Sequence, residues 1–244
     1  MQFDSYIVSE TKTAFSVPLT TSYKLEKKKY KGFTLAETLI TLSIIGVIAA
    51  MTIPTLMTRV QHHGYVVALK KFHNSLQNVI KLLPENLGCS SGDYACAMAG
   101  IRTDNKFNLE ALSSQFKLIV DTDNCKYKHN GYDVACFQTA DGALIFEEAA
   151  NVQLASIGVD INGTKGPNLE GRDIFHFDIA FVDNKYNSGI RVGTVLPTGS
   201  KLHANYYGDS GFHWKYHCKD NLEKSNGSGY FCTGRVLETG KMDY

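Results

Sequence analysis

The six cysteines are the residues whose type and spacing most directly predict chemistry, namely disulfide bond formation. They are Cys89, Cys96, Cys125, Cys136, Cys218 and Cys232. An even number of cysteines without any C-x-x-C pair favours disulfides over a metal site. The short separations favour the local pairs Cys89–Cys96, Cys125–Cys136 and Cys218–Cys232.

Oxygen donors with a spacing loosely like that of a calcium loop lie within residues 159–173. Asp160, Asn162 and Asp173 would supply the ligands, and Gly163 permits a sharp turn. Lys165, however, stands where a calcium loop would carry another acid. A metal-free turn held by Asp and Asn side-chain hydrogen bonds explains the same residues. We favour the turn, keep calcium as the alternative, and expect no other cofactor.

Three further donors, His213, His217 and Cys218, have the spacing of metal ligands on a helix. Their glycine-rich and aromatic surroundings favour an irregular surface segment instead. No G-x-S-x-G, H-E-x-x-H or P-loop motif occurs in the sequence, so we do not expect an enzyme. The net charge of +1 gives no reason to expect nucleic acid as a partner.

The elements that must position these residues begin with an apolar segment. From Thr38 to Met57 the chain has 20 residues and no charged side chain. As a helix this segment would be roughly 30 Å long, about the thickness of a bilayer core. A buried helix of a soluble domain and a secretory signal peptide are the alternatives. The first is disfavoured because a core helix is rarely apolar on every face, the second because no clean small-x-small cleavage site follows.

The residues that flank the apolar segment predict its orientation. Residues 24–31 hold five lysines and one glutamate, and such a basic flank is typically retained in the cytoplasm. We therefore expect residues 1–32 inside and the chain after the segment outside. All six cysteines follow the segment, which agrees with export to an oxidising compartment. Glu37 lies at the start of the segment, where a carboxylate usually needs a partner.

The stretch Lys31-Gly32-Phe33-Thr34-Leu35-Ala36-Glu37 resembles the processing site of type IV pilins and type II secretion pseudopilins. In that family a membrane aspartyl peptidase cuts after the glycine and methylates the new N-terminal amine. The resemblance implies cleavage after Gly32, methylation of Phe33 and a role in assembly for Glu37. Pro54 matches the helix-bending proline of the family.

The resemblance also implies partners and a location. The partners would be the prepilin peptidase and methyltransferase, other pilin or pseudopilin subunits, and an assembly platform in the inner membrane. The chain would be a structural subunit that crosses the cytoplasmic membrane once and then enters a filament in the periplasm or at the cell surface. The alternative is a single-pass membrane-anchored binding or adhesion protein that never polymerises. The mature N-terminus distinguishes the two.

The expected fold is α+β, with a long N-terminal helix packed on a small antiparallel sheet. Beyond Pro54, apolar residues recur at helical spacing at Val66, Leu69, Phe72, Leu76, Val79, Ile80 and Leu83. Pro84 and Gly88 should end the helix near residue 83, and Pro54 should loosen or bend it. The chain then divides into a leader (1–32), an assembly helix (33–57), an amphipathic continuation (58–83) and an exported disulfide-bonded domain (84–244).

Strands are expected after the helix. Residues 173–182 alternate, with Phe175, Phe177, Ile179 and Phe181 on one face and His176 and Asp178 on the other. This pattern predicts a strand with one exposed face and His176 at the surface. Other strand candidates are 117–120, 134–138, 143–146 and 190–196, and residues 108–116 predict a short helix.

Overall fold

The computed structural model describes residues 32–100, 102–103, 106–107, 109–150, 154–181, 192–218 and 229–244. The lysine-rich part of the expected leader, Asn108 of the expected short helix and residues 190–191 of one expected strand lie outside these ranges. The chain divides between Met57 and Thr58 into two compact units. Helix α1 (Leu35–Asn86) contributes its first part to one unit and its second part to the other.

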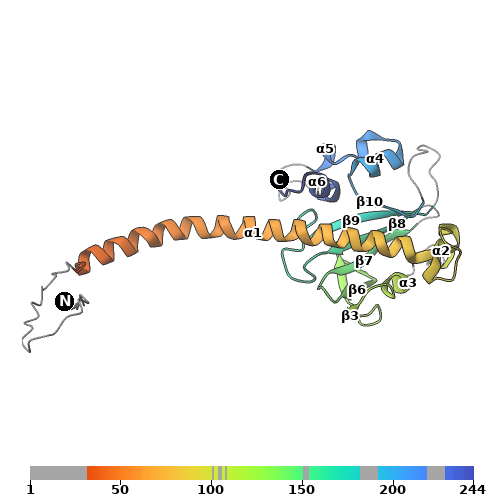
Figure 1. The fold of residues 1–244 in the computed structure, drawn as a ribbon, viewed down its shortest axis with the longest axis horizontal. Coiled ribbons are helices and arrows are strands. Elements are labelled where there is room, and N and C mark those ends of the chain that lie inside the picture. The colour runs from red at the N-terminus through yellow and green to blue at the C-terminus, as the bar shows by residue number, and fades with distance from the viewer. Residues whose placement is uncertain are drawn as a thin grey trace, which may run out of the picture. The chain divides into compact units, whose positions relative to one another are not determined.

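Helix α1 continues through both prolines that were expected to perturb it (Figure 1). Pro54 does not interrupt the helix, and Pro84 lies inside its last turn, so the expected end near residue 83 was wrong by three residues. Each proline removes one backbone donor, a loss that a long helix can accommodate. Gly88 ends the helix with a φ of 76°, while the N–H groups of Gly88 and Cys89 donate to the carbonyls of Glu85 and Pro84. This is the Schellman arrangement, which requires a left-handed residue at Gly88.

The second part of α1 carries the expected amphipathic stripe. Its buried residues are Val66, Leu69, Phe72, Leu76, Ile80, Leu83 and Pro84. Val79 is half-buried beside them. Burying one such large apolar side chain contributes about 1.5–3 kcal/mol, so the stripe is the main attachment of the helix to the rest of the second unit.

The second unit contains a six-stranded antiparallel sheet in the order β10-β9-β8-β7-β6-β3 (Figure 1). Its strands are β3 (Leu118–Val120), β6 (Cys136–Thr139), β7 (Leu144–Ala150), β8 (Leu154–Asp160), β9 (Ile174–Ala180) and β10 (Thr194–Pro197). From β6 to β10 each strand pairs with the next one in the chain, so the sheet is largely a meander. A long helix packed on this sheet confirms the α+β expectation.

Smaller elements surround the sheet. They are α2 (Tyr94–Gly100), β1 (Arg102–Thr103), β2 (Lys106–Phe107), α3 (Leu109–Ser113), β4 (Tyr127–His129), β5 (Tyr132–Val134), α4 (Lys201–Tyr207), η1 (Ser210–Phe212), α5 (Trp214–His217) and α6 (Cys232–Thr239). Helices α4, α5 and α6 gather beside β10 (Figure 1). The short helix α3 matches the helix expected from residue 108. The strand expected over 134–138 is divided between β5 and β6, which belong to different sheets.

Strand β9 is buried on both faces, which corrects the expected exposed face. Phe175, Phe177 and Ile179 join the core that includes the second part of α1. His176 and Asp178 point the other way, and yet they are only 0% and 3% exposed. The ring of Tyr230 stacks on His176, and the His203 ring forms a hydrogen bond with Asp178. The segments that carry Tyr230 and His203, near the C-terminus, therefore cover this face. The alternation correctly identified the two faces, but it contains no information about what covers them.

Strand β8 was not predicted, although it lies in the middle of the sheet. Its sequence, LASIGVD, contains Gly158, which usually argues against a strand interior. A side chain at this position would place its Cβ 2.1 Å from the Phe146 ring on β7. The glycine therefore makes room for an aromatic ring on the neighbouring strand.

Candidate functional site

The expected processing site lies directly before α1. Gly32 and Phe33 precede the helix, and Phe33 is 85% exposed. The backbone N–H of Glu37 donates to Thr34 Oγ1 at 3.2 Å, and the backbone N–H of Thr34 donates to Glu37 Oε2 at 2.8 Å. The Thr34 hydroxyl also donates to Glu37 Oε2, at 2.9 Å. This reciprocal pair is a capping box, so Glu37 has a partner within its own chain.

The first part of α1 exposes its large apolar side chains on all sides. They are Leu35, Leu39, Ile40, Leu42, Ile44, Ile45, Val47, Ile48, Met51, Ile53, Leu56 and Met57. This stretch is long and apolar enough to cross a membrane, and none of the residues in its most apolar part is buried. Burying an exposed side chain of this size would contribute about 1.5–3 kcal/mol, so this surface is more stable in an apolar environment than in water.

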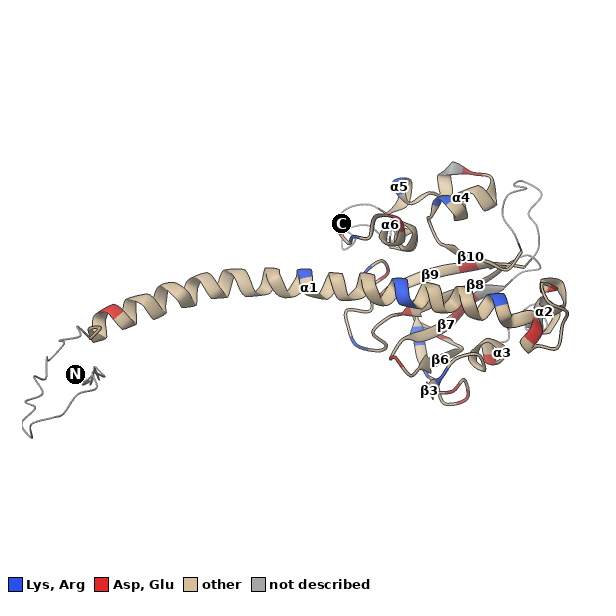
Figure 2. Ribbon diagram, in the orientation of Figure 1, with Lys and Arg blue, Asp and Glu red and all other residues tan. Residues whose placement is uncertain are grey.

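Hydroxyl groups in the same stretch bond the backbone of their own helix. The bonds run from Thr38, Thr41, Ser43, Thr52 and Thr55 to the carbonyls of Leu35, Thr38, Leu39, Ile48 and Met51, at 2.8–3.4 Å. Between Glu37 and Arg59 the sequence has no charged residue, as the uniformly tan ribbon in Figure 2 shows. These hydroxyls therefore need no water, which suits a helix in lipid or in a helix bundle.

Three disulfides join the pairs that the spacing favours. Cys89–Cys96 links the end of α1 to α2, Cys125–Cys136 links the segment before β4 to β6, and Cys218–Cys232 links the end of α5 to the start of α6. Within the described ranges no cysteine is free. All three disulfides belong to the unit after Thr58.

The two carboxylates of the calcium hypothesis are buried. Asp160 and Asp173 are both 0% exposed, at the end of β8 and just before β9. The backbone N–H groups of Asn168 and Leu169 donate to Asp173 at 2.9 and 2.7 Å. The Tyr127 hydroxyl lies 3.5 Å from Asp160 Oδ2. Burial, and then the charge of Asp173, raise the pKa of Asp160 to about 7.

Asn162, the third hypothetical calcium ligand, is held in the turn by its side chain. Its Nδ2 donates to the Tyr65 hydroxyl at 3.1 Å and to the Gly166 carbonyl at 3.3 Å. Its backbone N–H lies 3.3 Å from Asp160 Oδ1, which is an Asx turn. These bonds account for Asp160, Asp173 and the Asn162 amide nitrogen without a cation. Asn162 Oδ1 has no hydrogen-bond partner among the described residues, and calcium binding stays a prediction.

The expected ligand-like trio near residue 213 has structural roles. The His213 side chain accepts the backbone N–H of Lys215 at 3.3 Å and caps α5. Cys218 is in a disulfide and is not available to bind metal. His217 is exposed, and its ring stacks on Phe231 at 4.6 Å.

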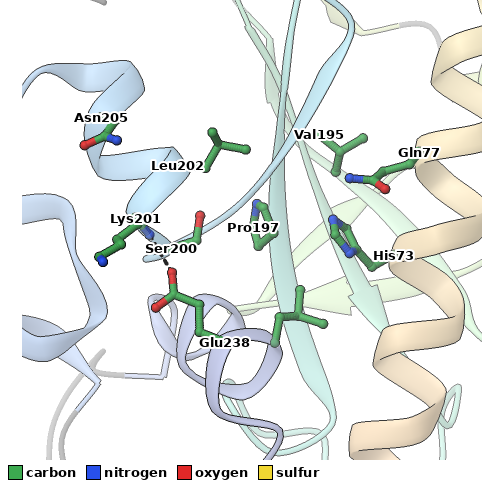
Figure 3. A pocket seen from close by; sticks show the side chains of 10 residues that line it. His73, Gln77, Val195, Pro197, Ser200, Lys201, Leu202, Asn205 and Glu238 are labelled. Atoms are coloured by element: carbon green, nitrogen blue, oxygen red, sulfur yellow. Dashed lines mark hydrogen bonds between the residues drawn. The ribbon is translucent and has the colours of Figure 1, made fainter. Parts of the chain in front are cut away.

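Figure 3 shows a pocket of about 370 Å³ in the second unit, between α1, β10, α4 and α6. Its lining residues include His73 and Gln77 from α1 and Ser200 at the start of α4. The Ser200 hydroxyl accepts the backbone N–H of His203 and caps α4, and the Lys201 backbone N–H donates to Glu238 at 2.7 Å. The polar groups of this pocket thus mainly form hydrogen bonds at the ends of helices. Among the described residues that line it, no nucleophile is hydrogen-bonded to a base.

One buried network contains a serine, a histidine and an aspartate, but it is not arranged for catalysis. Asp178 receives hydrogen bonds from Ser156 at 2.5 Å and from Tyr207 at 3.0 Å, and lies 3.1 Å from His203 Nε2. Burial raises the pKa of Asp178, but the bonds with His203, Ser156 and Tyr207 outweigh burial and hold the pKa below its usual value. Because the serine donates to the aspartate and not to the histidine, the network lacks an activated nucleophile.

A second polar cluster was missed entirely by the sequence reasoning. His129 of β4, Glu148 of β7, Glu170 before β9 and His176 of β9 converge on the face of the sheet opposite α1. These residues are far apart in the sequence and belong to no recognisable motif. The alternation of β9 gave one usable signal, since it placed His176 opposite the phenylalanine face.

Comparison with known proteins gives one match, at the N-terminus. Residues 27–53 match the family model described as the prokaryotic N-terminal methylation motif. No curated protein and no solved structure matches the chain. The matched stretch ends at residue 53, so it describes the start of α1 and contains no information about the unit after Thr58.

Proposed function

We propose that this chain, which carries the prepilin signature of type IV pilins and pseudopilins, is a structural subunit of a type IV pilus or of a type II secretion pseudopilus. The prepilin peptidase cuts it after Gly32 and methylates Phe33. The mature subunit then polymerises through the first part of α1. The chain has a structural role in this proposal and catalyses no reaction.

The observation that carries the proposal is the surface of the first part of α1. Its apolar side chains are exposed all round, and its hydroxyls bond its own backbone. Before assembly, membrane lipid surrounds these apolar side chains. After assembly, they pack against the same part of α1 in neighbouring subunits. The globular unit meanwhile folds on the second part of α1 and has its own core.

The proposed topology follows from the charges and the cysteines. The lysine-rich residues before Gly32 remain in the cytoplasm, α1 crosses the membrane once, and the disulfide-bonded unit lies outside. The partners are the peptidase and methyltransferase, other pilin or pseudopilin subunits, and the inner-membrane assembly platform. The filament lies in the periplasm or extends from the cell surface.

Glu37 links processing to assembly in this proposal. Before cleavage its carboxylate accepts hydrogen bonds from Thr34, within the capping box. After cleavage, Phe33 bears a positive amine four residues before Glu37, just ahead of the start of α1. In a staggered bundle, the Glu37 carboxylate of one subunit meets the Phe33 amine of its neighbour, where ion pairs are weakly screened.

Two substitutions at Glu37 separate its charge from its capping role. Glu37→Ala removes both, whereas Glu37→Gln keeps a side chain that can complete a capping box but has no charge. We expect both variants to be inserted and cut after Gly32, and both to enter filaments poorly. Gly32→Leu is the processing control and should leave the uncut chain in the membrane.

The readout is the fraction of subunit in sheared or purified filaments, compared with the fraction in the membrane. If Glu37→Gln assembles as well as the unchanged chain, the charge is not needed and the capping box alone explains Glu37. If Glu37→Ala also assembles normally, Glu37 has no role in assembly. The alternative is an anchored binding protein that never polymerises. In that case filaments contain neither the unchanged chain nor any of its variants.

A further inference from the structure

Three asparagine–glycine pairs occur in the sequence, and in each of them a side-chain amide can react with its own backbone. They are Asn130-Gly131, Asn162-Gly163 and Asn226-Gly227, of which the last lies outside the described ranges. In such a pair the backbone nitrogen of the glycine attacks the side-chain carbonyl carbon of the asparagine. Glycine allows this attack best, because it has no Cβ to hinder the approach. The two described pairs have opposite surroundings.

Asn130 and Gly131 form the exposed tip of the hairpin between β4 and β5. His129 of β4 pairs with Tyr132 of β5, so these two residues make up the whole turn, and their φ angles are 50° and 85°. This is the two-residue turn that Asn-Gly favours. Both residues are exposed, and a Cβ on Gly131 would have no atom within 4 Å. Among the described backbone hydrogen bonds none comes from the Gly131 N–H, so this nitrogen can turn toward the Asn130 side chain.

The imidazole of His129 lies directly beside the amide that would react. Its Nε2 is 3.1 Å from Asn130 Nδ2, the nitrogen that would leave as ammonia. The His129 ring packs on the Phe146 ring, with 4.7 Å between the centroids, and the His129 side chain is only 13% exposed. The imidazole is therefore held in place. An imidazole accepts and donates protons near neutral pH, and the departure of ammonia requires such a proton transfer.

Asn162 and Gly163 have the same sequence but are held on both sides. Asn162 Nδ2 donates to the Tyr65 hydroxyl at 3.1 Å, and the Gly163 N–H donates to the Asp160 carbonyl at 3.3 Å. Gly163 is buried, and a Cβ there would lie 2.8 Å from the Gly142 carbonyl oxygen. The amide and the attacking nitrogen cannot turn toward each other without breaking these hydrogen bonds. The second pair is therefore a matched control within the same chain.

We propose that Asn130 is a site of spontaneous deamidation in the folded chain, and that His129 assists the reaction. The Gly131 nitrogen forms a bond with Asn130 Cγ and loses its proton to water. The Cγ–Nδ2 bond then breaks, and His129 Nε2 gives a proton to the nitrogen that leaves as ammonia. The imidazole regains its proton from water. A further water opens the resulting succinimide ring to aspartate or isoaspartate, so the net reaction consumes one water and releases one ammonia.

The product changes both the charge and the backbone of the hairpin tip. Aspartate at position 130 adds a carboxylate beside His129, whose Nε2 already lies 3.5 Å from Glu170 Oε1. Isoaspartate instead routes the backbone through the side chain and adds one carbon to the turn between β4 and β5. The neighbouring Tyr132 is 76% exposed, so the change alters a surface that other molecules can reach. The site lies outside α1 and does not depend on the proposed function.

The test is mass-spectrometric mapping of the purified full chain in detergent, incubated in water enriched in heavy oxygen. The water that opens the ring labels each new carboxyl group, which distinguishes new conversion from aspartate already present. Fragment ions must assign the label, since no lysine or arginine separates Asn130 from Asn162 in the sequence. We expect conversion at Asn130 to be faster than at Asn162 by about tenfold or more, because hydrogen bonds must break before Asn162 reacts. In the control, a chain that is unfolded in denaturant and reduced, the two sites should react at similar rates.

A substitution at His129 tests its assistance. His129→Phe keeps a ring that can pack on Phe146 but has no proton to transfer, and it should slow conversion at Asn130 in the folded chain. Tyr132→Phe, at the exposed residue after the turn, is the matched control and should react as the unchanged chain does. The fluorescence of Trp214 checks that each variant is folded.

The outcomes separate the two parts of the proposal. Equal rates at Asn130 and Asn162 in the folded chain, or conversion at Asn130 only after unfolding, would overturn the site. An unchanged or faster rate in folded His129→Phe protein would overturn the role of His129. None of these readouts depends on whether the chain enters a filament.

Discussion

The two parts of helix α1 have the same backbone conformation and opposite surroundings. Before Thr58 its large apolar side chains are exposed on every face, whereas after Thr58 a single stripe of them is buried. The second part is explained by the chain itself, because the sheet covers its stripe. The first part is not, because no described residue of its own unit covers it. The first part of α1 therefore fits contact with a membrane or with another molecule, whereas the second part is a structural element of a folded domain.

The largest expected effect comes from one substitution in each part of the helix. Leu76→Ala removes a fully buried side chain and should destabilise the second unit by about 2–5 kcal/mol. Ile45→Ala removes a side chain that is 61% exposed and should change the stability of that unit by less than about 0.5 kcal/mol. The fluorescence of Trp214, the chain's single tryptophan, can follow denaturant unfolding of the full chain in detergent. Equal losses in the two variants would mean that the two parts of α1 do not differ as described.

A second test concerns the three disulfides, all of which lie in the unit after Thr58. Replacing Cys218 and Cys232 together by serine should cost about 2–4 kcal/mol. Replacing Cys89 and Cys96 should cost less, since the sequence separation is 7 rather than 14 and each doubling of a loop adds about 0.6 kcal/mol. Peptide mapping without reductant checks the pairing itself. Free thiols, or Cys89 joined to Cys218, would contradict it.

The third test concerns Asp160, whose environment is typical of a folded interior. Because its pKa is raised to about 7 in the folded chain, the folded state binds a proton that the unfolded state releases above about pH 4. Stability should therefore fall as pH rises from about 5 to 7, by on the order of 1 kcal/mol per pH unit from this group. Asp160→Asn should flatten this dependence.

A calcium ion at Asp160 would alter that pH dependence. It would hold both carboxylates ionised, so a chelator would lower the thermal midpoint at neutral pH and Asp160→Ala would remove the sensitivity. We expect the chelator to leave the midpoint unchanged, since backbone hydrogen bonds of the turn account for the carboxylates of Asp160 and Asp173.

The sequence predicted the long helix, its buried stripe and the strand at β9, because each has a strong period. It did not predict β8, since Gly158 resembles a breaker until the Phe146 ring beside it is known. It also placed His176 at the surface, because a strand pattern cannot reveal that the C-terminal segment folds back over one face. The histidine–glutamate cluster depends on contacts between residues up to 47 positions apart, from 129 to 176, and local patterns do not contain such contacts.

The processing segment was predictable for the opposite reason. The lysine run, Gly32-Phe33, the acid at Glu37 and the uncharged span are contiguous, and residues 27–53 match the methylation motif as one block. The structure adds the capping box between Thr34 and Glu37, for which the sequence contains the spacing Thr-x-x-Glu.

The central claim is that the first part of α1 becomes the N-terminus of a mature filament subunit. The most direct test is the intact mass and N-terminal fragment of the chain extracted from the membrane of cells that have the processing enzyme. We expect a chain that begins at Phe33 and carries one methyl group on its amine. A chain that retains the residues before Phe33, or that has been cut after the apolar segment, would contradict it.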